Sequence, residues 1–135
     1  MNFKLKAITA VCALAFAGQA FAVGPTPSQA NASTVKLFIS GSSALQSTIG
    51  QVANGLFTAG TMSVFFDGTA TATGASGKSY RAYAGTFSAA AGTTLSGKSG
   101  VMYETAAGGS IVGVVPVAQA TTVAKIDLTD RKSVV

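Results

Sequence analysis

The chain has 135 residues, of which 48% are hydrophobic and 10% charged, and its formal net charge is +5. With no histidine and a single cysteine, it offers no imidazole general base, no internal disulfide and no soft metal-ligand set. Its basic residues are scattered and do not form the stripe that nucleic-acid binding requires. We therefore expect no enzyme, no metal or other cofactor, and no nucleic-acid partner.

The first 22 residues have the pattern of a bacterial secretory signal peptide. Lys4 and Lys6 precede an apolar run over residues 7–18 that is short for a membrane span, and residues 20–22 (Ala-Phe-Ala) form a small-x-small cleavage site. The alternative is an uncleaved membrane anchor. We expect cleavage and a periplasmic or secreted protein, whose mature chain has no cysteine because Cys12 leaves with the signal peptide.

A polar leader and a strand follow the cleavage site. Residues 23–34 contain two prolines and few large apolar side chains, so this leader is predicted to be disordered. Val35–Ile39 are mostly apolar and β-branched, which predicts a buried strand and the beginning of the folded domain, residues 35–129.

The strand runs directly into a turn and then a helix. The turn is Ser40–Ser43, and from Leu45 to Leu56 apolar residues recur at the spacing of one helical face. Ser43 with Gln46 three residues later is a capping-box pattern that would fix the start of this helix. Gly60 is the expected C-terminal stop.

The second half of the domain alternates short apolar runs with Gly- and Thr-rich loops. Proline would clash inside a helix, so residues 111–120 are predicted to contain a short turn and then a new helix starting at Pro116. The alternation predicts an α/β fold with a β-hairpin or loop insertion between residues 68 and 100. The expected strands are Met62–Phe66, Tyr80–Phe87, Val101–Thr105 and an interrupted one over Thr121–Leu128.

The last six residues, 130–135 (Asp-Arg-Lys-Ser-Val-Val), match the translation of a common short-read sequencing adapter. We interpret them as adapter read-through and expect the chain to be the N-terminal fragment of a longer protein. An ordinary polar C-terminus is the alternative. Between the signal peptide and this tail, five basic and three acidic residues leave a net charge of +2.

One catalytic motif can be rejected. Residues 33–36 (Ser-Thr-Val-Lys) match the Ser-x-x-Lys pattern of penicillin-recognising enzymes. That pattern requires its serine at a helix start, whereas Val35–Ile39 is strand-like, and no partner motif follows. The acids Asp67, Glu104 and Asp127 are isolated in the sequence.

Two Gly/Ser turns are the strongest candidates for a binding site. A helix N-terminus exposes backbone N–H groups and a partial positive charge, which favour an anion. Gly41 lets the backbone approach a ligand, Ser42 and Ser43 add hydroxyls, and residues 107–110 (Ala-Gly-Gly-Ser) repeat the design. At one end of a sheet the two turns would form a shared crevice. The alternative is that Ser43 only caps its helix and that Gly108 and Gly109 only make a turn.

Residues 35–57 (VKLFISGSSALQSTIGQVANGLF) resemble the start of mature phosphate-binding-like periplasmic receptors, the solute-binding components of ABC transporters with the type 2 periplasmic-binding fold. A weaker likeness covers residues 80–120. The resemblance implies that the Gly/Ser-rich loop after the first strand contacts an oxyanion. The positions carried over are Gly41, Ser42, Ser43 and Ala44, and more loosely Gly108, Gly109 and Ser110.

The phosphate receptors also use an Asp and an Arg around the anion. Asp67 and Arg81 are the only nearby candidates in this chain, and neither lies in a recognisable motif. A solvated surface charge is the alternative role for each of them.

The sequence thus predicts a partial, N-terminal lobe of a type 2 periplasmic-binding-protein-like fold. We expect it to bind phosphate or another small oxyanion for uptake through an ABC-transporter membrane permease. A structural or adhesive cell-surface protein on the same fold, without a ligand, is the alternative.

Overall fold

A computed structural model of the chain describes residues 23–67 and 79–129. The expected signal peptide, most of the first Gly/Thr-rich loop and the adapter-like tail lie outside the described residues. Within 23–67 and 79–129, no helix is long and apolar enough to cross a membrane.

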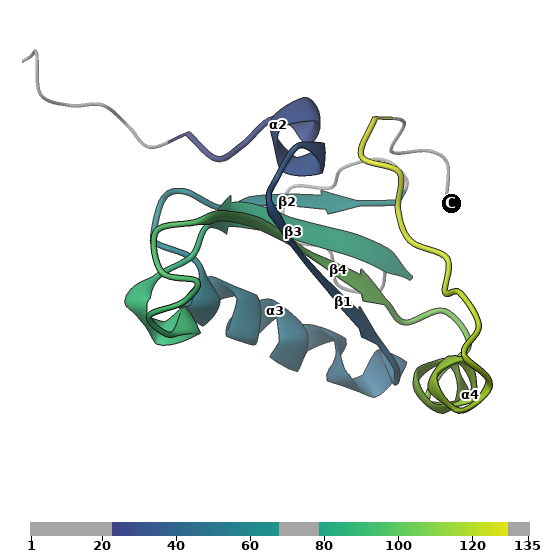
Figure 1. The fold of residues 1–135 in the computed structure, drawn as a ribbon. Coiled ribbons are helices and arrows are strands. Elements are labelled where there is room, and N and C mark those ends of the chain that lie inside the picture. The colour runs from purple at the N-terminus through teal and green to yellow at the C-terminus, as the bar shows by residue number, and fades with distance from the viewer. Residues whose placement is uncertain (1–22, 68–78, 130–135) are drawn as a thin grey trace, which may run out of the picture.

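A mixed sheet forms the centre of the fold (Figure 1). Its order is β1-β4-β3-β2, with β1 parallel to β4 and the other two pairs antiparallel. The α/β class is therefore confirmed, and each of these strands lies within two residues of its predicted bounds. The strands are β1 (Val35–Ser40), β2 (Ser63–Phe66), β3 (Tyr80–Thr86) and β4 (Ser99–Thr105).

One face of the sheet is covered by helix α3 (Gln46–Leu56). The helix was predicted from the spacing of its apolar residues, and Ala53, one of them, is fully buried against the sheet. After the helix the chain turns extended at Phe57, whose ring stacks on Phe87 with centroids 4.8 Å apart. The helix thus ends before Gly60, which has a positive φ of 78° in the following turn and is not the stop that we expected.

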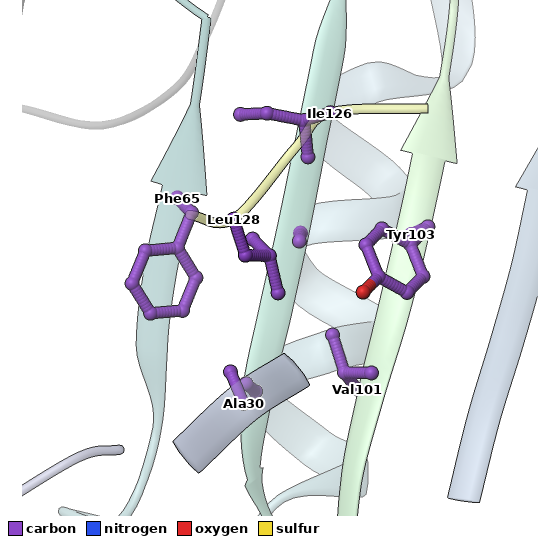
Figure 2. Packing of buried hydrophobic residues seen from close by; sticks show 8 residues of the cluster. Ala30, Phe65, Val101, Tyr103, Ile126 and Leu128 are labelled. Carbon is purple, nitrogen blue, oxygen red and sulfur yellow. The ribbon is translucent and has the colours of Figure 1, made fainter. Parts of the chain in front are cut away.

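The opposite face is covered by helix α2 (Pro27–Asn31) and by the extended C-terminal segment, residues 121–129 (Figure 2). Ile126 and Leu128 cross over the central strands and are buried together with Phe65 and Tyr103. The interrupted strand that we predicted here is reduced to one bridge residue, Ile126, and the segment is not one of the four strands of the sheet in the described residues. It adds apolar contacts to the sheet and one hydrogen bond, from the Thr105 hydroxyl to the Ala124 carbonyl over 2.7 Å.

The leader, residues 23–34, differs from its predicted disorder. Thr26 and Gln29 form a reciprocal capping box, and Pro27 occupies the first turn of α2, where its missing N–H is not needed. Ala30 is fully buried on the sheet. The short helix is therefore held by its cap and by tertiary contact, neither of which requires the apolar periodicity that predicts longer helices.

Helix α4 (Ile111–Gln119) corrects another prediction, because Pro116 lies inside it and does not start it. Proline has no N–H to donate to the preceding turn, and its presence in the interior of a helix costs about 3 kcal/mol. The helix nevertheless begins at Ile111, five residues before the predicted start, and Gly113 in its first half packs on the end of β1. It ends at Ala120, which adopts the left-handed conformation with φ 51°.

Candidate functional site

The two Gly/Ser turns meet at one end of the sheet. They follow β1 and β4, and because these strands are parallel neighbours, both turns leave the sheet at the same edge. The Gly41 N–H donates to the Thr105 carbonyl over 3.1 Å. A Cβ at Gly113 would lie 2.7 Å from the Ser40 carbonyl oxygen and 3.0 Å from the Gly41 Cα. Helix α4 therefore packs directly on the first turn.

The helix cap in the first turn is one residue away from its predicted position. Ser42 is extended, with ψ 131°, and its Oγ accepts from the Ala44 N–H over 3.3 Å. The chain then makes a 3-10 turn at Ser43–Leu45 before α3 begins at Gln46. The Ser43–Gln46 capping box is therefore wrong, because the tighter entry turn moves the last extended residue to Ser42. Ser43 is exposed.

Neither sterics nor backbone conformation requires a glycine at position 41. A Cβ there would meet nothing within 4 Å, and its φ is not positive. In the second turn the opposite holds, since Gly108 and Gly109 have φ values of 90° and 69°, which L side chains rarely adopt. Ser110 stands at the N-cap of α4 without a side-chain cap bond. Gly41, Ser43 and Ser110 are thus the turn residues whose identity the fold itself does not explain.

Arg81 does not lie on the surface. It is 3% exposed, beneath α3, and pairs across the sheet with Glu104, which is 2% exposed. Its Nη1 lies 3.6 Å from Glu104 Oε2 and donates to the Gln46 carbonyl oxygen over 3.3 Å. The surface role considered for Arg81 is therefore wrong: the side chain is buried and ties the first turn of α3 to the sheet.

Tyr83 completes the buried cluster. Its hydroxyl accepts from Arg81 Nη1 over 3.3 Å and donates to Glu104 Oε2 over 3.0 Å. Burial raises the pKa of Glu104, and it outweighs the opposing effects of the Tyr83 hydrogen bond and the Arg81 charge. The pKa of Tyr83 is also raised, chiefly by burial. Among the described residues, the second carboxylate oxygen of Glu104, Oε1, is buried without a hydrogen-bond partner.

Asp67 lies at the same edge of the sheet as the turns but belongs to another contact. Its carboxylate accepts from the Tyr80 N–H over 3.1 Å, and its own N–H donates to the Tyr80 carbonyl over 3.2 Å, which closes the end of the β2–β3 pair. From β1 to β2 the sheet crosses three strand spacings, or about 14 Å. An anion at Gly41 is therefore out of reach of Asp67.

Glu104 and Tyr83 were not identified from the sequence as members of this site. The available signal was strand alternation, which places Glu104 and Met102 on one face of β4, the face that α3 covers. An acid on a covered face needs a partner, and Arg81 is the directly opposed residue on β3.

No group of three or more His, Cys, Asp or Glu side chains that could hold a metal ion is found in residues 23–67 and 79–129. No family model matches the chain, and no curated protein or solved structure resembles it significantly. Function must therefore be argued from the geometry of the chain itself.

Proposed function

We propose that the protein is a secreted solute-binding module that holds phosphate or another small oxyanion at the crevice formed by its two Gly/Ser turns. The observation that carries this proposal is the meeting of the turns after the parallel strands β1 and β4, with α4 packed on Gly41. Ligands of open α/β sheets bind at this end of the strands.

The chemistry of the crevice suits a small anion held mainly by the main chain. The first turn leads into the 3-10 turn at Ser43–Leu45 and the second into α4, and the N-terminus of a helix carries about half a positive charge. At the first turn the N–H groups of Ala44 and Leu45 already donate to Ser42. Ser43 and Ser110 can add hydroxyl donors, and Gly41 leaves room for the ligand to touch the backbone. Arg81 contributes indirectly, since it fixes the first turn of α3 from below.

On this proposal the lobe is the N-terminal part of a type 2 periplasmic-binding fold, and it delivers its ligand to an ABC-transporter permease. Support comes from the resemblance of residues 35–57 to phosphate-binding-like receptors and from the mixed sheet with α3 on one face.

A second candidate function is a structural or adhesive surface protein without a ligand. It is favoured by the apolar side chains that α4 presents to solvent: Ile111, Val114 and Val117 are 65%, 66% and 83% exposed. Such a surface is unusual for an isolated soluble domain and typical of a contact with another protein.

Calorimetric titration of the whole chain with phosphate, sulfate and molybdate separates the two functions. A receptor binds at least one of them, and a ligand at about 100 times its Kd raises the free energy of unfolding by about 2.7 kcal/mol. No heat and no thermal stabilisation with any of the three would refute the oxyanion proposal.

The variant Gly41→Ala locates the site. The added methyl meets no protein atom, so stability should be unchanged, while an anion that touches the backbone there should bind at least tenfold more weakly. Gly55→Ala is the matched control, because a Cβ at Gly55 on α3 also meets nothing within 4 Å. Equal affinities for both variants would place the anion elsewhere.

A further inference from the structure

A cavity of about 450 Å³ lies at the edge of the sheet, between β1, helix α4 and residues 121–125. Of the first Gly/Ser turn only Ser40 lines it, and the residues that we assigned to the oxyanion, 41–44 and 108–110, do not. The cavity therefore requires its own explanation, which is independent of the proposed function.

Two stacked rings form one wall of the cavity. Phe38 on β1 and Tyr103 on β4 lie with centroids 5.2 Å apart and planes 9° from parallel. Phe38 remains 64% exposed, although it points to the same face as the buried cluster around Tyr103. Pro116 and Val117 of α4 provide further apolar lining. An aromatic ring of a ligand would find parallel aromatic and aliphatic surface here.

Two charged groups act at this wall, Lys125 in the lining and Asp127 close by. Lys125 Nζ lies 5.1 Å from the centroid of the Tyr103 ring, and no other residue lining the cavity in the described parts of the chain is charged. Asp127, two residues further on, turns its carboxylate to Thr129, from which it accepts the N–H and the hydroxyl over 2.8 and 2.7 Å. Burial, and secondarily Asp127, raise the pKa of Tyr103, so its hydroxyl stays neutral.

We infer that this cavity binds a small aromatic carboxylate, with its ring against Phe38 and Val117 and its carboxylate on the Lys125 ammonium. The volume lies in the range of small-molecule sites, which are mostly apolar with a few placed polar groups. The positive charge selects an anion, and the ring wall selects a flat apolar body over a bare oxyanion. Binding would also cover the apolar surface that Phe38 and Val117 leave in water.

The probe is benzoate, titrated into the whole chain by calorimetry and followed by the NMR shifts of the tyrosine rings. Benzamide has the same ring without the charge, and cyclohexanecarboxylate has the charge without the aromatic ring. We expect benzoate to bind and each analogue to bind about tenfold more weakly. No benzoate binding at millimolar concentrations overturns the inference, and equal binding of either analogue overturns the part that it tests.

Two variants assign the contacts, and both change side chains that are not fully buried. Lys125→Met keeps the apolar stem and removes the ammonium, and Phe38→Leu removes the ring, so each should weaken benzoate about tenfold. Lys98→Met, an exposed position outside the cavity, is the matched control and should bind as the unmodified chain does. Thermal unfolding of each variant establishes that it is folded. Unchanged affinity in a folded Lys125→Met would refute the carboxylate contact.

Phosphate provides the last arm of the test. The two sites share no assigned residue, so saturating phosphate should leave benzoate affinity unchanged whether or not phosphate itself binds. Displacement of benzoate by phosphate would show one common anion site and would overturn the inference of a separate cavity.

Discussion

Replacing Arg81 by methionine should destabilise the protein strongly, through the acid that the change leaves behind. The side chains of Arg81 and Glu104 are 3% and 1% exposed. Methionine fills a similar volume, but it removes the only cation within salt-bridge distance of Glu104 in the described chain. The carboxylate then keeps a single hydrogen bond, from the Tyr83 hydroxyl, while its Oε1 already has none.

The expected loss follows from that geometry. Removing one partner of a buried ion pair costs about 3–5 kcal/mol, because the other charge stays buried without compensation. Against a total stability of about 5–15 kcal/mol for a domain, this is a large fraction. The loss also includes the bond from Arg81 to the Gln46 carbonyl, so the first turn of α3 should loosen as well.

Urea unfolding of Arg81→Met at neutral pH measures the loss, and the double variant Arg81→Met/Glu104→Gln identifies its cause. If the stranded carboxylate is responsible, neutralising it should restore at least half of the lost stability. Lys98→Met, which removes an exposed cation, should stay within about 0.5 kcal/mol of the unmodified chain. A loss below about 1 kcal/mol for Arg81→Met, or no recovery in the double variant, would refute the reasoning.

Further tests concern pH, the cap and the core. Glu104 has a folded pKa raised above 4.5, so the folded state binds its proton more tightly; its stabilising contribution is full below pH 4.5 and is lost as pH rises through the folded pKa. Urea midpoints across that window should show this decline, and Glu104→Gln should lack it. Ser42→Ala should lower the free energy of unfolding by about 1 kcal/mol, whereas Ser43→Ala should change it by less than about 0.5, and the reverse order would make Ser43 the cap. Gly100→Ala would place a Cβ 2.1 Å from Phe87 Cε2 and should cost about 1–3 kcal/mol in thermal unfolding; an unchanged midpoint would show that the ring yields freely.

The strands and α3 were predictable because each has a local pattern of apolar residues, although β3 and β4 are buried on both faces. β1, β2, β3 and β4 have apolar or β-branched runs of strand length, and α3 repeats its apolar residues at helical spacing. These periodicities are local, so a single sequence reveals them. The common edge of the two Gly/Ser turns was predicted only as a condition, because it depends on the non-local parallel pairing of β1 with β4.

The remaining features depend on partners that are distant in the sequence. The role of Arg81 could not be predicted because nothing near it in the chain indicates Glu104, which only strand register brings opposite. The helix in the leader gave no periodic signal because α2 is five residues long and buries one alanine. The helix around Pro116 was not predicted because packing of Gly113 on β1 overrides the local preference against proline.

The parallel pairing of β1 with β4 has a kinetic consequence. Val35 is aligned with Gly100, whereas β2, β3 and β4 are joined to one another by hairpins of much shorter separation. Closing the long loop has an entropic cost that must be met before its contacts form, so the hairpin strands should assemble first and β1 should dock last on the open edge of β4. The contact between Gly41 and the end of β4 forms only after that docking. A ligand bound there would therefore stabilise the last step of folding. It would slow the dissociation of β1 from the sheet more than the opening of the hairpin strands.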